Sequence, residues 1–165
     1  MFAKEKLDYQ AVALPDRLDM NDAQALEAVT EHLAFMRKRH SVREFAPTPV
    51  PREIIDAAVT AAGSAPSGAN HQPWHFVAIS SADVKHQIRL AAEAEEEKFY
   101  AGGASDEWIK ALEPIGTDAS KPHLDIAPWL IVIFAHRWGE FDDGTRYKNY
   151  AVPESVGIAT GLLIS

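Results

Sequence analysis

The 165-residue chain contains no cysteine, and this absence excludes several kinds of chemistry together. Without thiols the chain has no disulfide, no thiolate nucleophile and no cysteine-ligated metal site. Long apolar runs are also absent, since none approaches the roughly 18 residues that a membrane-spanning helix requires. The N-terminal residues 1–6 are too charged for a signal peptide. We therefore expect a cytoplasmic protein with no membrane partner.

Positive charge is scarce, since 16 Lys and Arg residues stand against 24 Asp and Glu residues, for a formal net charge of −8. A nucleic-acid surface requires clustered cations, so we expect no nucleic-acid partner. The net charge describes the whole surface and still allows a local basic pocket.

Hydrophobic residues make up 47% of the chain, enough for a packed core, and the length suits one domain. We expect a single domain over residues 1–165, with residues 1–20 as an extended arm. The apolar residues 157–165 keep a helical rhythm without a polar cap or turn after them. This pattern predicts that the C-terminal part of the domain is missing.

Hydrophobic periodicity predicts helices and strands that alternate irregularly, which favours one α+β domain. Strands are expected over 75–79 and 127–135. Residues 101–118 are expected to form a glycine-rich loop with a short helical piece around Trp108, and residues 137–149 a polar loop. Helices are expected over 22–38, 52–62, 82–100 and from about 152 onwards.

Several familiar sites do not match the sequence. It has no Gly-x-Gly-x-x-Gly turn and no Walker-type loop. His71 and His75 have the spacing of a helical metal-binding pair, but Pro73 between them breaks the helical geometry. A nucleophilic triad around Ser67 stays open, although this serine is not in a Gly-x-Ser-x-Gly elbow and no His or Asp is placed to serve it.

A phosphate-binding site is one interpretation of Arg39, Ser41 and Arg43. If the chain is extended there, alternate side chains point to one face, and two guanidinium groups with a hydroxyl suit a phosphate. The alternative is a solvated helix end, because the helix dipole favours cations near the C-terminus of a helix. The loop of small residues 65–69 adds backbone that a flat ligand can approach closely.

These two segments together resemble the FMN-dependent nitroreductase superfamily. The resemblance is carried by the run 39–45 (RHSVREF) and the run 65–77 (APSGANHQPWHFV), and residues 155–159 resemble the central helix of the family. It implies a nitroreductase-like α+β fold with a central mixed sheet flanked by helices, and a homodimer with FMN at its interface. The FMN-binding residues that it implies are Arg39, His40, Ser41, Arg43, Pro66, Ser67, Gly68 and Ala69.

Within that superfamily the chain is most similar to the iodotyrosine deiodinases of the soluble bacterial type. The resemblance implies substrate contacts from the Ala69 amide and from a lid formed by Glu96, Tyr100 and Lys121. Glu96 and Tyr100 are neighbours on one helical face, and with Lys121 they offer partners for the ammonium and carboxylate of an amino acid. The alternative is a surface Glu, a packed Tyr and a loop Lys.

The expected function is FMN-dependent reductive dehalogenation of halotyrosines, in which the cofactor supplies the difficult chemistry and no side chain is assigned as catalytic. One alternative is a general NAD(P)H-dependent nitroreductase that acts on nitroaromatic substrates. Another is a truncated, non-catalytic flavin-binding protein. His40 stands where the resembled family usually has a second Arg, and the remaining flavin contacts of the family lie beyond Ser165.

Overall fold

The computed structural model describes residues 10–14 and 16–165, which divide into two compact units. The first unit comprises the described residues up to Ser41 together with Ala61–Pro73 and Ala135–Ser165. The second comprises Val42–Thr60 and Trp74–Phe134. The expected arm over residues 1–20 lies partly outside the described residues, and within residues 10–14 and 16–20 the chain has no helix or strand.

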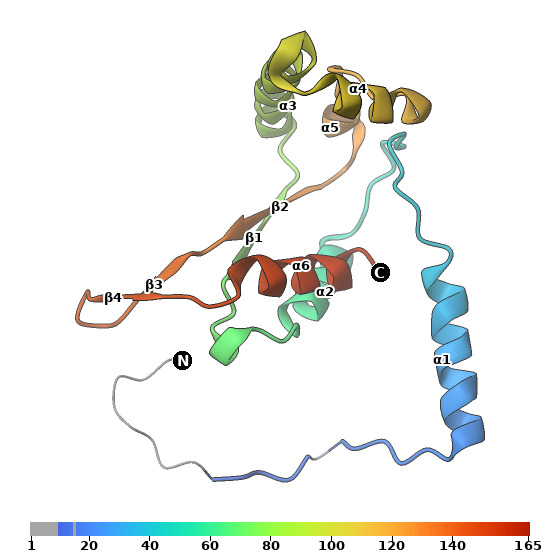
Figure 1. Cartoon of the computed structure of the whole chain (residues 1–165), viewed down its shortest axis with the longest axis vertical. Helices are drawn as coiled ribbons and strands as arrows, with labels where there is room; N and C mark the ends of the chain where they lie inside the picture. The colour runs from blue at the N-terminus through green and yellow to red at the C-terminus, as the bar shows by residue number, and fades with distance from the viewer. Residues whose placement is uncertain (1–9, 15) are drawn as a thin grey trace. The chain divides into compact units, whose positions relative to one another are not determined.

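Helices and short strands alternate irregularly along the chain, which confirms the α+β class (Figure 1). The expected central mixed sheet is represented, within the described residues, by two two-stranded sheets that pair β1 with β2 and β3 with β4. The helices are α1 (Asp22–Met36), α2 (Arg52–Gly63), α3 (Ala82–Lys98), α4 (Asp106–Leu112), α5 (His123–Ile126) and α6 (Val152–Leu163). The strands are β1 (Trp74–Ile79), β2 (Leu130–Ala135), β3 (Trp138–Glu140) and β4 (Arg146–Lys148).

Helix α1 begins where the sequence predicts, because Asn21 forms a capping box with Gln24. The Asn21 side chain accepts a hydrogen bond from the Gln24 N–H at 3.0 Å, and the Gln24 side chain accepts one from the Asn21 N–H at 3.0 Å. The helix ends at Met36, two residues before the expected end. No side chain of α1 is buried, and its exposed apolar residues include Leu26, Val29 and Leu33.

The prediction of a polar loop over residues 137–149 is wrong, because β3 and β4 form an antiparallel hairpin there. The Tyr147 ring lies against the backbone of Gly139, where an added Cβ would come within 2.2 Å of the ring. The turn uses Gly144 at a φ of 80°, a conformation that suits glycine. Asp143 and Gly144 form the Asp-Gly pair that is typical of tight hairpins, so a local signal for this hairpin was present.

In the second unit, α3 starts at the expected residue, Ala82, where the Ser81 hydroxyl caps the helix by accepting a hydrogen bond from the Val84 N–H. The four-residue helix α5, which the sequence did not predict, packs beside α3 (Figure 1). After α3, the chain continues in a π-helical turn, η2 (Phe99–Gly103), that leads to α4. These elements bring residues of the 117–127 segment against one face of α3.

Within the described residues few apolar side chains are fully enclosed, and the buried ones are Ala62, Ala65, Pro73, Ala127, Val152 and Ala159. Three polar residues are as deeply buried, and each of them forms hydrogen bonds: Lys85, Asn149 and Ser155. In the part of the chain that the structure describes, no helix has the length and apolar character to cross a membrane.

Candidate functional site

One face of α3 and its continuation carries a row of polar side chains, at spacings of four, four, three and four residues. These spacings keep all five side chains on one side of a helix, because each step is close to a whole number of turns. The row opposes the segment 117–127. Its members are Lys85, Arg89, Glu93, Glu96 and Tyr100.

The end of this row lines a cleft of about 570 Å³. Glu96, Tyr100 and Lys121, the predicted substrate-binding set, all contribute to its wall. The Lys121 ammonium lies 3.0 Å from the Glu96 carboxylate, and the Tyr100 hydroxyl donates a hydrogen bond to the Thr117 hydroxyl at 3.1 Å. The structure therefore brings together, within one cleft, three residues that span 25 positions of the sequence, from 96 to 121.

Aromatic rings form the apolar part of the same cleft. Phe99 packs edge-on against Trp108, with ring centroids 5.4 Å apart, and against Tyr100, with centroids 5.3 Å apart. The cleft thus joins an apolar surface to an acidic and a basic group. A small ligand with an apolar body and a charged end has matching surfaces there.

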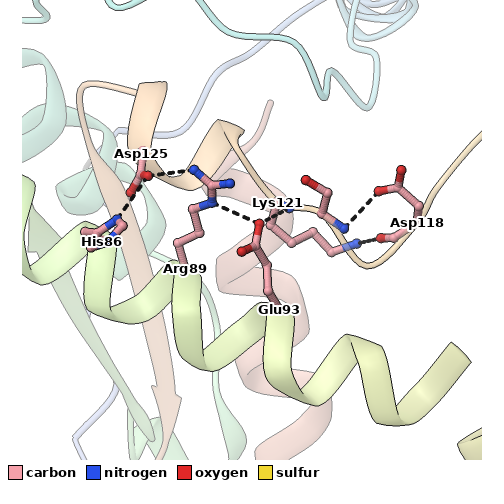
Figure 2. Close-up of polar contacts among 7 residues, drawn as sticks. His86, Arg89, Glu93, Asp118, Lys121 and Asp125 are labelled. Atoms are coloured by element: carbon pink, nitrogen blue, oxygen red, sulfur yellow. Dashed lines mark hydrogen bonds and ion pairs between the residues drawn. The ribbon is translucent and has the colours of Figure 1, made fainter. Parts of the chain in front are cut away.

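The middle of the row forms a network of ion pairs that Figure 2 shows. The Arg89 guanidinium donates to the Glu93 carboxylate at 2.9 Å and to the Asp125 carboxylate at 2.9 Å. Glu93 also accepts the backbone N–H of Lys121 at 2.7 Å. His86 lies 3.3 Å from Asp125 at the other edge of the network. The side chains of Arg89, Glu93 and Asp125 are all less than a third exposed.

These contacts shift the acid–base equilibria of the network. The Lys121 N–H and then the Arg89 guanidinium lower the pKa of Glu93 below its ordinary value of 4.5. The Arg89 hydrogen bond lowers the pKa of Asp125 below 3.8, with a smaller contribution from His86. In return, Glu93 and Asp125 raise the pKa of Arg89. All three groups are therefore held in their charged forms at neutral pH.

The predicted flavin loop belongs to the first unit, where a short 3-10 turn, η1 (Gly68–Asn70), interrupts it. The Ser67 hydroxyl accepts the backbone N–H of Gln72 at 2.9 Å and closes the loop. Pro66 and Ala69 are exposed, whereas Ser67 and Gly68 are partly buried. Three non-glycine residues of the loop have a positive φ, namely Ala69, Asn70 and Gln72. This conformation is uncommon for such residues, and contacts with the surrounding structure must offset the backbone strain.

Tertiary contacts that the sequence did not predict hold this loop in place. The Gly68 N–H points at the hydroxyl of Ser155, which is 2% exposed, at 3.4 Å. The His71 ring is bonded to the Asn149 side chain at 2.9 Å, and Asn149 in turn donates to the His136 carbonyl at 2.7 Å. The motif around Ser155 marked its helix, but nothing local indicated the role of Asn149, which lies 78 residues from its partner in the loop.

The predicted phosphate-binding residues follow α1, beyond Met36. Arg39, His40 and Ser41 belong to the first unit and Arg43 to the second, and all four residues are exposed. This segment contains no helix or strand. Two guanidinium groups, an imidazole and a hydroxyl within five positions are a donor set that fits an anionic group such as a phosphate. The predicted convergence of Arg39, Ser41 and Arg43 stays a prediction.

Comparisons with known proteins agree on one family. The sequence matches the model of the nitroreductase family over residues 36–164. It is 49% identical, over 140 residues, to an iodotyrosine deiodinase of Haliscomenobacter hydrossis, an alignment that covers 85% of this chain and 63% of that protein. It is 40% identical to an iodotyrosine deiodinase 1 of Homo sapiens, over 82% of this chain and 47% of that protein. The chain thus spans roughly half to two thirds of the length of these curated relatives.

A solved structure extends the likeness to three dimensions. The crystal structure of an oxidized iodotyrosine deiodinase bound to FMN and 3-iodo-L-tyrosine matches with a TM-score of 0.70 at 30% identity, over 80% of this chain and 66% of that chain. These matches confirm the resemblance inferred from the runs 39–45 and 65–77. Because the family match covers most of the sequence, the chain belongs to the nitroreductase family.

Proposed function

We propose that this chain forms part of an FMN-dependent oxidoreductase that removes a halogen from the ring of a halotyrosine. The observation that carries the proposal is the pairing of Glu96 with Lys121, at 3.0 Å, beside Tyr100 in an aromatic-lined cleft. The 49% identity to a protein named iodotyrosine deiodinase supports it.

The Glu96–Lys121 pair offers the two partners that the amino-acid end of such a substrate requires. In the structure the two side chains pair with each other, and Lys121 also donates to the Asp118 carbonyl. An entering zwitterion would place its ammonium on Glu96 and its carboxylate on Lys121 and the Tyr100 hydroxyl. A ligand with only one of the two charges would leave one member of the pair unmatched, which costs binding free energy.

The residues that would hold FMN are those of the runs 39–43 and 66–69. Their chemistry fits the cofactor, since cations and a hydroxyl suit its phosphate and a loop of small residues suits its flat ring. When bound, FMN would supply the two electrons of the reaction, which an external donor of the nicotinamide class would restore. The ring carbon–halogen bond is replaced by a carbon–hydrogen bond, and one proton is taken up as halide leaves. We include the Ala69 amide as a contact to the substrate phenolate.

Within this proposal, Glu96, Tyr100 and Lys121 would cover the substrate and exclude water, and they would orient the ring rather than exchange protons with it. The homodimer and the cytoplasmic location belong to the same proposal. The exposed apolar stripe of α1, which includes Leu33, supports a second copy as its partner.

The test is a titration of the FMN-loaded protein with 3-iodotyrosine, followed by flavin fluorescence. We expect saturable quenching, and at least about tenfold weaker binding of 3-iodotyramine, which lacks the carboxylate to which Lys121 would donate. Under reducing conditions, iodide and tyrosine should appear in equal amounts.

Each alternative has its own outcome. Unquenched fluorescence together with NADPH-dependent reduction of a nitroaromatic compound would identify a general nitroreductase and refute the deiodinase proposal. A protein that binds FMN and reduces neither substrate would be a non-catalytic flavin-binding protein. A colourless protein that FMN does not reconstitute would overturn the flavin proposal altogether.

A further inference from the structure

Glu93 lies one turn before Glu96 on the same face of α3, but it is not part of the cleft wall. Its carboxylate accepts the backbone N–H of Lys121 at 2.7 Å, and the same oxygen accepts the Arg89 Nε–H at 2.9 Å. Lys121 is therefore held at two points of one helix, its backbone by Glu93 and its ammonium by Glu96. Figure 2 shows the backbone contact and its continuation to Asp125.

The same helix face fixes the rest of the segment. Arg89 joins Glu93 to the Asp125 carboxylate at 2.9 Å. One turn further back, the Lys85 ammonium donates to the Asp125 carbonyl at 3.0 Å and to the Ala127 carbonyl at 2.7 Å. Residue numbers fall along α3 as they rise along the segment, so the two run antiparallel. A shift of the segment by one residue would break all of these contacts together.

Without these contacts Lys121 would have many positions available. It precedes α5 in a stretch with no helix or strand, and a lysine side chain loses considerable conformational freedom when one position is fixed. A carboxylate that is itself held by a guanidinium is a rigid acceptor, because Arg binds in a fixed geometry. Fixing the Lys121 backbone restricts where its ammonium can meet a ligand.

We propose that Glu93, braced by Arg89 and Asp125, is a positioning residue that sets Lys121 opposite Glu96 and so determines how tightly the cleft binds the amino-acid end of a ligand. The inference rests on the proposed function for the identity of that ligand. It assigns to Glu93 no contact with substrate or cofactor. Loss of Glu93 should therefore lower the affinity for the halotyrosine and leave FMN binding unchanged.

The experiment compares Glu93→Ala and Glu93→Gln with Glu97→Gln in the FMN-loaded protein. Glu97 is an exposed residue of α3 outside the cleft wall and the network, so its variant matches the loss of charge without touching Lys121. We expect the Kd of 3-iodotyrosine to rise about tenfold in Glu93→Ala, because ligand binding would then have to order the Lys121 backbone. Glu93→Gln keeps an oxygen for the Lys121 N–H, so it should show a smaller increase of about threefold.

A second measurement needs no substrate. Hydrogen exchange of the ligand-free protein should show faster exchange of the Lys121 amide in Glu93→Ala than in the wild type, with Glu97→Gln unchanged. If Glu93→Ala does not fold, Glu93→Gln supplies both measurements, with a smaller increase in the Kd and in the Lys121 exchange rate, because an amide oxygen is a weaker acceptor than a carboxylate.

Unchanged exchange at Lys121 would overturn the inference, whatever the ligand titration gives. So would an equal loss of FMN and 3-iodotyrosine binding, or an effect of Glu97→Gln as large as that of Glu93→Gln. Faster exchange at Lys121 in a protein whose wild type ignores 3-iodotyrosine would refute the proposed function alone. The positioning of Lys121 by Glu93 would then remain valid, and the cleft would bind a different ligand.

Discussion

Replacing Lys85 with methionine should destabilise the second unit, because Lys85 is the most deeply buried charged residue in the part of the chain that the structure describes. Its residue surface is 6% exposed, and its ammonium donates to the carbonyls of Asp125 and Ala127. Methionine keeps most of the apolar stem but donates no hydrogen bond. The substitution therefore isolates the contribution of the ammonium group.

The magnitude follows from the surroundings of the two carbonyls. The Ala127 bond is buried, and an unsatisfied buried acceptor costs about 1–3 kcal/mol. The Asp125 bond is only partly buried, so water can replace the ammonium there at a cost below about 1 kcal/mol. Relief of the desolvation of the ammonium offsets part of the sum. We expect a net loss of about 2 kcal/mol, equivalent to a decrease of roughly 4–8 °C in Tm.

Urea unfolding followed by circular dichroism measures this loss, with Lys98→Met as the matched control. Lys98 lies on the same helix, its side chain is 71% exposed, and it pairs with Glu95. An exposed pair contributes little, so the control should change the free energy of unfolding by less than about 0.5 kcal/mol. If Lys85→Met is as stable as Lys98→Met, water serves both carbonyls equally well, and the reasoning about Lys85 is refuted.

Three further predictions concern the site. Glu96→Gln should weaken 3-iodotyrosine binding about tenfold while FMN binding stays constant, as measured by fluorescence titration; equal losses would indicate a role in folding. Arg43→Ala should lower FMN affinity or shift its reduction potential, and unchanged cofactor content and potential would contradict the role given to Arg43. The lowered pKa values of Glu93 and Asp125 mean that their contribution to stability is fully present above pH 4.5 and is lost as the pH falls through the folded pKa values. Urea unfolding between pH 7 and pH 3 checks this, and Glu93→Gln should flatten the decrease.

Only part of the cleft could be predicted from local patterns in the sequence. Glu96 and Tyr100 were predicted to share a helix face because their spacing alone places them there. Lys121 was added by resemblance, since no local rule relates it to a helix 25 positions earlier. No role was predicted for Glu93 from the sequence. In the structure Glu95 and Glu97 are exposed, whereas Glu93 is turned towards Lys121 and Arg89.

Local sequence signals predicted some helices and strands correctly and missed others. Caps at Asn21 and Ser81 fixed the starts of two helices, because the capping side chain and the N–H that it accepts lie within three residues. The hairpin over 137–149 was missed although Asp143 and Gly144 mark its turn. Polar residues on both strands obscured the alternation that usually identifies a strand. The short helix α5 had no periodicity to detect, since four residues make little more than one turn.

The sequence by itself determined the family, the α+β class, most helix positions and the candidate residues of two motifs, because each of these depends on contacts or patterns within a few residues. Only the tertiary structure decided which of those residues meet. It placed Lys121 against Glu96, and it gave Glu93 and Lys85 backbone partners on a segment about 30 to 40 positions away. Such pairings depend on how α3 and the 117–127 segment pack, and packing is a property of the folded chain rather than of any local pattern.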